Sequence, residues 1–413
     1  MDNGLGLSRR RFLGLGAAGV GSAALSPYLS SLKAFAAPSV GARDGILVTL
    51  VFDGGNDGLN TLCPVGIGTY HDLRPNIGIA PGQGLPVSKY LALHPSFRNV
   101  KAHWDAGHVA IVQGVGYPQP DLSHFESMDT WMHGWGGAGT PSTGWLGRWL
   151  DGLPNAASES LYAVAVDDSV PMHLVGAHSH ASSLPLSVDG GFGMDRSDAS
   201  DRRLYSATKN FGTDGSGLGH WGDLYGDAMS QLMDLTVRIG PAYGKPAPRA
   251  YIGQQLALAA RLINANLGIR ALHVHVGSFD THADQPDYHA RLLAEVDSAI
   301  GSFFRYLEPT WKSRTALMTF SEFGRRPEEN GDRGTDHGTA SVCFVMGTNV
   351  KGGLYGAYPP LRDLDDYGNL KASVDFRQVY ATILSSWLKA DHRQVLGRAY
   401  SGLGFFRSGP GTV

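Results

Sequence analysis

The sequence predicts an α/β fold with a mostly parallel sheet that is sandwiched by helices. Continuous apolar, β-branched runs such as 45–52 (GILVTLVF) are typical of parallel strands that are buried on both faces. These runs alternate along the chain with helical patterns, as βαβ units do. The chain also has 56 glycines in 413 residues, far above the usual ~7%, which predicts long loops that present ligands.

The N-terminus has the pattern of an export signal. Residues 8–13 (SRRRFL) are basic and precede a weakly apolar run, 14–25, which is shorter than the ~20 apolar residues of a membrane span. Residues 34–36 (AFA) have the small-x-small pattern that signal peptidase cleaves. The pattern resembles the twin-arginine (Tat) signal. We therefore expect residues 1–36 to be cleaved, with the Tat machinery and signal peptidase as partners and a periplasmic or secreted product. The alternative is a short transmembrane anchor.

Charge and cysteine content exclude two classes of protein. Cleavage would remove four of the 34 basic and one of the 37 acidic residues, which leaves a net charge of −6. A mildly acidic product argues against nucleic-acid binding. The two cysteines, Cys63 and Cys343, are too few for a disulfide framework, and their spacing leaves open whether they pair. No segment after the signal predicts a stable membrane span.

We expect residues 37–413 to form a single α/β domain with a loop or cap insertion at about 170–250. Large α/β folds reach this length around one core, and Gly, Ser, Asp and Asn dominate the middle of the insertion. His173, His178 and His180 lie near its start. We predict loop histidines here, because no carboxylate follows them at metal-ligand spacing.

The first predicted strand, 45–52, ends at an acidic, glycine-rich segment, 53–60 (DGGNDGLN). Ligands bind at the carboxyl ends of parallel strands, and glycines let the backbone approach them closely, so Asp53 is a candidate ligand-binding residue. The alternative is an Asx/Gly turn without a ligand. A helix from 94–96 and a strand at 108–115 are predicted to complete a right-handed β-loop-α-β unit.

Ser123 begins the next predicted helix. A serine three residues before Glu126 is a capping-box pattern, so its hydroxyl could serve only to cap the helix. The alternative uses the same position: a helix N-terminus favours phosphate or sulfate, and a nearby metal could make the hydroxyl a nucleophile. Ser123 and the adjacent His124 are therefore candidate catalytic residues.

Most of the remaining ionisable candidates lie in the stretch 271–338. A strand from Ala271 ends near Asp280 and His282, a helix is predicted over 288–307, and a second strand, 315–320, ends at Glu322. Strand ends that carry both carboxylates and imidazoles suit a divalent metal such as Zn²⁺ or Mn²⁺. The candidate metal ligands are Asp53, Asp280, His282, Glu322, Asp336 and His337.

Arg325 follows this acidic segment and is the third candidate catalytic residue. Its guanidinium could neutralise a bound oxyanion, and a surface salt bridge is the alternative. Further along, 340–346 is predicted to be a strand, and Asp375 is predicted to cap a final helix over 379–388.

The ordered motifs resemble a known family. FDGGNDGLN, SHF, SFDTH, FSEFGR, GTDHG and DFR together are similar to the exported, uncharacterised DUF1501 family. Over about 45–130 and 270–345, the order is also similar to the alkaline phosphatase superfamily, which includes sulfatases, phosphopentomutase and cofactor-independent phosphoglycerate mutase. The resemblance implies an alkaline phosphatase-like fold that holds one or two divalent ions (Zn, Mn, Mg or Ca) at the carboxyl ends of its sheet.

The resemblance also implies roles for particular residues. It places Asp53 at one metal with Ser123 as the nucleophile, and it places the set Asp280, His282 and His337 at the other. Phe323 stands where relatives have a His, and Glu322 stands where they have the Asp before it. One imidazole ligand would therefore be missing, which puts the second metal and full catalytic competence in question.

Two functions from different classes follow. The first is an exported, metal-dependent hydrolase of phosphate or sulfate esters, small-molecule or polysaccharide, with Ser123 as nucleophile. The alternative is a catalytically degenerate binding protein on the same fold, for an envelope polysaccharide. Phe323 favours it, as do four tryptophans in the glycine-rich segment 127–150, which could bind sugars or simply pack. A metal-free Ser-His hydrolase is disfavoured, since no Gly-x-Ser-x-Gly motif surrounds Ser123.

Overall fold

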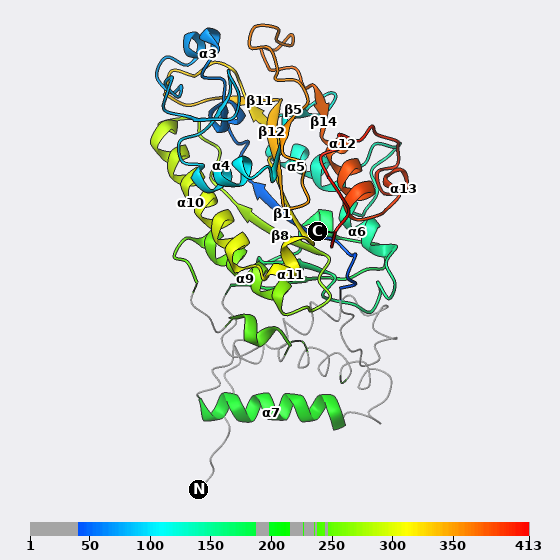
Figure 1. Ribbon diagram of the computed structural model, residues 1–413. Helices are drawn as coiled ribbons and strands as arrows, with labels where there is room; N and C mark the ends of the chain where they lie inside the picture. The colour runs from blue at the N-terminus through cyan, green and yellow to red at the C-terminus, as the bar shows by residue number, and fades with distance from the viewer. Residues whose placement is uncertain are drawn as a thin grey trace. The chain divides into compact units, whose positions relative to one another are not determined.

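The computed structural model describes residues 40–186, 198–214, 238–243 and 247–412, together with Gly226 and Leu235. The chain divides into two compact units, one that includes residues 188–240 and one of residues 37–187 and 241–413. The described part of the first unit is mainly helix α7 (Ala199–Asp214) (Figure 1). The signal at 1–36 and part of the insertion at about 170–250 lie outside the described residues, and the single-domain interpretation stays a prediction.

The second unit is built on a nine-stranded sheet with the order β13-β5-β12-β9-β1-β8-β6-β7, and β14 pairs with β5. Among these strands β12 alone runs antiparallel to its neighbours. The predicted fold class, a mostly parallel sheet between helices, is therefore confirmed. The strands are β1 (Ile46–Phe52), β5 (Val109–Gly116), β6 (Ala163–Ala165), β7 (Ala181–Ser183), β8 (Ala271–Val276), β9 (Thr315–Phe320), β12 (Ser341–Met346), β13 (Gly353–Tyr355) and β14 (Val374–Asp375).

The neighbours of β1 differ from those that the chain order suggests. The strand predicted at 108–115 is β5, and β9 and β12 lie between it and β1. β1 pairs instead with β8 and β9, which come more than 200 residues later in the chain. Hydrophobic periodicity identifies a strand but carries no information about its partner, so the order of strands could not be predicted from it.

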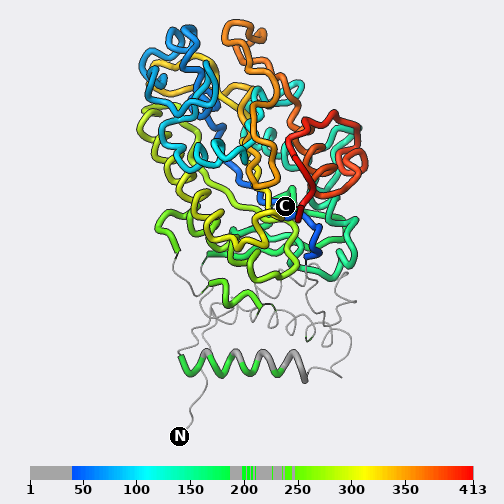
Figure 2. Tube along the Cα trace, viewed as in Figure 1, coloured from blue at the N-terminus to red at the C-terminus, as the bar shows by residue number. Residues whose placement is uncertain are grey.

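Helices cover both faces of the sheet (Figures 1 and 2). On one side lie α4 (Arg98–Asp105), α9 (Tyr251–Asn264) and α10 (Gln285–Tyr306), and α10 packs against both of the others. On the other side lie α5 (His124–His133), α6 (Trp145–Asp151), α12 (Phe376–Thr382) and α13 (His392–Leu396). The apolar stripe predicted over 288–307 is α10, whose Leu293, Val296 and Phe303 are buried.

The tryptophans of 127–150 mostly belong to the core on the α5 side. Trp131, Trp145 and Trp149 are buried. Trp131 stacks on Phe320 with ring centroids 5.3 Å apart, and Trp145 stacks on Tyr380 at 4.1 Å. These three side chains are therefore used for packing, the explanation preferred for tryptophans on a long loop.

The sheet order brings three chain segments to one edge. β1 lies between β8 and β9, with Phe52 opposite Val276 and Val51 opposite Phe320. Because all three strands are parallel, the residues that follow them meet at their common carboxyl end. Those residues include Asp53, Asp280 and Glu322.

Two further expectations concern the cysteines and the membrane. Cys63 and Cys343 are both buried and free, so they do not pair, and burial raises the pKa of each thiol. Within the described residues, every helix is too short or too polar to cross a bilayer.

Candidate metal centre

Three imidazole rings converge on the carboxylate of Asp280. His282 Nε2 lies 3.0 Å and His337 Nε2 lies 3.1 Å from Asp280 Oδ1, and these two nitrogens are 3.1 Å apart. His124 Nε2 lies 3.5 Å from Asp280 Oδ2. The structure thus brings together three candidates that the sequence placed at one metal, and adds His124 from the start of α5.

The spacing of Asp280 Oδ1 and the Nε2 atoms of His282 and His337 suits three ligands of a tetrahedral metal ion. Ligands bound to Zn²⁺ at 2.0–2.1 Å lie about 3.3 Å from one another, and these three atoms lie 3.0–3.1 Å from one another. Ligand atoms of His124, Asp280 and His337 all lie within 4.8 Å of one another, so these residues could hold an ion. An imidazole-rich set with one carboxylate suits Zn²⁺ or Mn²⁺ better than Mg²⁺ or Ca²⁺, which favour oxygen ligands.

The second nitrogen of each ring has its own hydrogen-bond partner. His124 Nδ1 lies 2.7 Å from Glu322 Oε1, and His282 Nδ1 lies 3.3 Å from Asp336 Oδ1. His337 Nδ1 lies 2.9 Å from the carbonyl oxygen of Leu122. With the protons assigned to Nδ1 on this basis, each ring turns an Nε2 lone pair toward Asp280. Metal-binding histidines are commonly oriented in this way.

Glu322 and Asp336, predicted as ligands, contact the rings of the group through these bonds. Glu322 is only 1% exposed, and it accepts hydrogen bonds from the backbone N–H of Gly54 at 2.8 Å and from Ser321 Oγ at 3.0 Å. Its carboxylate is therefore held rigidly behind His124. Glu322 was identified by its position after a strand and Asp336 by the motif of its loop. Neither signal shows whether a carboxylate faces an ion or bonds to a ring of another candidate ligand.

Arg325 lies beneath the group instead of facing the solvent. Its side chain is 0% exposed, and it donates to the carbonyls of Gly55 at 2.6 Å, Phe279 at 3.2 Å and Thr335 at 2.8 Å. It also donates to Asp280 Oδ1 at 2.6 Å. The alternative of an exposed salt bridge does not describe this residue, because the guanidinium is buried while it pairs with Asp280. It joins the loops that follow β1, β8 and β10 (Gly324–Arg325).

The same contacts set the charge of Asp280. Partial burial would raise the pKa of this carboxyl, but the hydrogen bond and the positive charge of Arg325 outweigh it and lower the pKa to about 2. Asp280 is therefore an anion throughout the neutral range. The antiparallel pairing of β10 with β11 (His337–Gly338) places Arg325 opposite His337 and fixes their positions relative to one another.

Asp53 lies apart from the three imidazoles. Its Oδ2 is 2.6 Å from His275 Nδ1, and Asp167 Oδ2 is 3.4 Å from His275 Nε2. The hydrogen bond that His275 donates to Asp53 raises the pKa of His275. His275 was missed in the sequence, although the alternation HVHV in β8 places two histidines on one face of that strand.

Ser123 occupies the N-cap position of α5, but its side chain makes no capping hydrogen bond. The backbone N–H of Ser123 instead donates to Asp121 Oδ1 at 2.6 Å. The capping box suggested by Glu126 is therefore not formed at this helix, and the purely structural explanation of Ser123 loses its support.

Phe323 fills the space next to the imidazoles. Its ring centroid lies 4.9 Å from that of His124 and 4.7 Å from that of His337, and the residue is 2% exposed. Gly55 makes room for it, since a Cβ on this glycine (φ +67°) would lie 2.3 Å from the Phe323 ring. The aromatic side chain is thus a packed part of the site.

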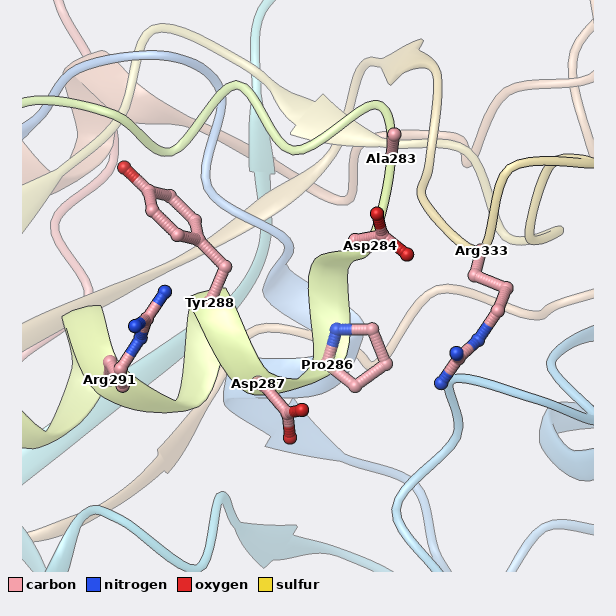
Figure 3. Close-up of a pocket in the computed structure, with 7 residues that line it drawn as sticks. All are labelled: Ala283, Asp284, Pro286, Asp287, Tyr288, Arg291 and Arg333. Carbon is pink, nitrogen blue, oxygen red and sulfur yellow. The ribbon is translucent and has the colours of Figure 1, made fainter.

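A pocket of about 540 Å³ opens over the group. Its polar floor is formed by Asp53, His124, Asp280 and Glu322. A second pocket, of about 350 Å³, lies at the start of α10 and is lined by none of the candidate residues (Figure 3). In that pocket Asp284 and Asp287 balance Arg291 and Arg333, so its charges favour no ionic ligand.

Glu322→Gln is expected to weaken metal binding by about 10- to 100-fold, the usual cost of losing a partner that orients a ligand. The amide keeps the size of the side chain, but it lacks the negative charge behind His124. Titration of the metal-free protein with Zn²⁺ would measure the change. Glu126 is an exposed acid on α5, the helix that carries His124. Glu126→Gln should therefore bind Zn²⁺ as tightly as the wild type. Equal affinity in the two variants would mean that Glu322 does not orient a ligand.

Comparisons with known proteins place the chain in a family. Among solved structures, it is similar to the PsFucS1 sulfatase from Pseudoalteromonas sp. (13% identity, 89% of this chain and 70% of that chain covered, TM-score 0.38). It is also similar to a protein in the alkaline phosphatase superfamily from Vibrio parahaemolyticus (9% identity, 86% and 72% covered, TM-score 0.32). No curated protein matches it in sequence. The family model described as "Protein of unknown function (DUF1501)" matches residues 108–402, more than half of the chain. The chain therefore belongs to the DUF1501 family.

Proposed function

We propose that the protein is a metal-dependent hydrolase of phosphate or sulfate esters with Ser123 as its nucleophile. One observation carries the proposal: three imidazole Nε2 atoms converge on Asp280, while each Nδ1 has a hydrogen-bond acceptor. Such an arrangement keeps unprotonated nitrogens 3.1 Å apart, which is favourable when a cation lies between them. The ligands in this proposal are His124, Asp280, His282 and His337.

The charges around the pocket support a cation as well. Asp53, Asp129, Asp280 and Glu322 line it, and the guanidinium of Arg325 is already bonded to protein atoms. An anionic ester would be repelled by this set. A divalent ion held by the imidazoles would offset the carboxylates and polarise the ester oxygen. Zn²⁺ or Mn²⁺ fits the donors best, and Asp53 would be available to a second ion only if it separated from His275.

Ser123 would supply the nucleophile from the N-terminus of α5. Its Oγ would lose its proton to water and bond to phosphorus or sulfur, while the bond to the alcohol oxygen breaks and that oxygen takes up a proton from water. A water molecule would then attack phosphorus or sulfur, release phosphate or sulfate, and return a proton to Oγ. The Ser123 hydroxyl makes no capping hydrogen bond, which leaves it available to attack the ester. The next residue, His124, belongs to the proposed metal group. Arg325 would act as a positioning residue that holds Asp280.

Ser123→Ala tests this role. It is expected to lower kcat toward aryl phosphate or aryl sulfate by about a thousandfold, because a nucleophile acts only in the chemical step, while metal content stays that of the wild type. Ser160→Ala, at an exposed serine elsewhere, should retain full activity. Unchanged turnover in Ser123→Ala would remove the serine from the mechanism.

Export belongs to the same proposal. The basic segment and the small-x-small pattern of residues 1–36 support passage through the Tat route to the periplasm or beyond. That route carries folded proteins, so the metal could bind before export. N-terminal sequencing of the exported protein should find Ala37 first; an intact N-terminus would contradict cleavage.

A non-catalytic binding protein is the second candidate. Phe323 favours the binding protein, because its ring contacts His124 and His337 at a position where a ligand side chain would otherwise bind an additional metal ion. Envelope polysaccharide would then be the partner. Metal analysis together with an ester-hydrolysis assay distinguishes the hydrolase from the binding protein. Bound metal with turnover supports the hydrolase, and polysaccharide binding without bound metal and without turnover supports the alternative.

A further inference from the structure

Helix α5 carries an apolar surface directly beside the candidate metal centre. The pocket over the group is lined by Phe125, Met128 and Met132 of this helix and by Met172 of the short helix η2 (Met172–Leu174), which contacts α5. The three α5 residues follow helical spacing, so they share one face. His124 reaches the metal group from the same turn. One helix thus joins the polar floor of the pocket to an apolar wall.

Of the four wall residues, Met128 packs against the hydrophobic core. Ser127 and Trp131, on another face of α5, are buried, and Trp131 stacks on Phe320 and Phe376 beneath the helix. Phe125, by contrast, is 87% exposed. A phenyl ring in this position contributes little to folding, and an exposed apolar surface beside a polar cluster is typical of a ligand site.

We propose that this wall binds the hydrocarbon chain of the substrate's alcohol, so that the preferred substrates are phosphate or sulfate esters of alkyl alcohols. This inference rests on the proposed function and specifies its substrate class. The charged ester group would lie at the polar floor beside His124 and Asp280, and the chain would extend along the wall.

The chemistry of the wall separates an alkyl chain from a sugar. Methionine side chains are flexible and polarizable, so three of them with one phenyl ring can fit a chain of variable conformation. Sugar hydroxyls would find almost no hydrogen-bond partners on these four side chains, and burial without such partners is costly. The volume of about 540 Å³ lies within the range of small-molecule sites.

The first test compares butyl, hexyl and octyl phosphate with glucose 6-phosphate, on the full, metal-loaded chain. We expect kcat/KM to rise by about two- to threefold for each added methylene, with glucose 6-phosphate at or below butyl phosphate. Phe125→Ser should flatten this dependence, whereas Tyr367→Ser, at a ring that is 79% exposed outside the pocket, should preserve it. Equal kcat/KM across the alkyl series would overturn the inference and leave the hydrolase proposal intact.

A second test does not need turnover. Calorimetry with butyl- and octylphosphonate, which are not hydrolysed, should show octylphosphonate binding at least about tenfold more tightly, and Phe125→Ser should reduce that ratio. This result would support the apolar site even if no ester were hydrolysed. Equal affinity for the two phosphonates, or the same ratio in Phe125→Ser, would contradict it.

Discussion

Replacing His337 by alanine is expected to remove the bound metal and to lower kcat/KM by about a thousandfold. His337 Nε2 lies 3.1 Å from both Asp280 Oδ1 and His282 Nε2, so its loss removes one corner of the proposed tetrahedron. A metal that polarises an ester oxygen contributes several kcal/mol to the transition state, which corresponds to this change in rate. Metal content per chain and aryl phosphate turnover, measured on the same sample, would show the effect.

His178→Ala is the matched control, since His178 is an exposed histidine outside the group. It should keep the metal content and turnover of the wild type. Chelation of the wild-type protein should reproduce the loss seen in His337→Ala, and added Zn²⁺ or Mn²⁺ should restore turnover only in the wild type. If His337→Ala retained its metal, the convergence of the three rings would need another explanation.

The centre of the site could be predicted because its residues follow strands with strong hydrophobic patterns. Asp280 and His282 come directly after β8, and the parallel sheet brings that strand's end beside those of β1 and β9. His337 depends on a different signal, since its loop was recognised by motif. Asp280 and His282 were assigned by their place after a strand and His337 by its motif, and both signals depend on local sequence.

The division of roles within the site could not be predicted, because it depends on contacts between distant segments. Glu322 bonds to His124 across 198 residues of chain, and His275 bonds to Asp53 across 222. Sequence spacing carries no information on which atom of a side chain faces inward. The same holds for Arg325, which follows Glu322 closely in sequence but whose carbonyl partners come from three separate loops.

Helix capping could be predicted where the capping hydrogen bonds join residues that are close in sequence. Asp375 accepts from the backbone N–H of Arg377 and forms a capping box with Gln378, so its predicted N-cap role is confirmed. The final helix begins at Phe376, three residues before the predicted start, and continues as a π-helical turn over Ile383–Trp387. At Ser123 the same type of pattern failed, since the side chain of Asp121 takes the backbone N–H.

Replacing Arg74 by leucine is expected to destabilise the fold by about 3–5 kcal/mol at pH 7. Arg74 and Asp57 are both 0% exposed and lie 2.6 Å apart, and removal of one partner leaves a buried charge without compensation. Asp57 also caps α2 (Gly58–Thr61), and Arg74 donates to the carbonyls of Arg326 and Pro327. The pair thus joins the loop after β1 to the segment after β10. Urea unfolding of the metal-free protein would give the difference.

The pH dependence of this difference identifies the charge as its cause. Burial alone would raise the pKa of Asp57, but Arg74 outweighs it and the folded pKa lies below the ordinary value. The contribution of Asp57 in the wild type is therefore fully present above the unfolded pKa of about 3.9 and is lost as the pH falls through the folded pKa. Without Arg74, burial raises the same pKa, so the variant gains relative stability when Asp57 takes up a proton. The difference between the two proteins should be largest near pH 7 and smaller at pH 4.

Arg362→Leu removes an exposed pair with Asp72 (75% and 68% exposed) and should change stability by less than about 0.5 kcal/mol at both pH values. A difference for Arg74→Leu that did not change with pH would mean that lost packing, and not the unpaired carboxylate, destabilises the variant.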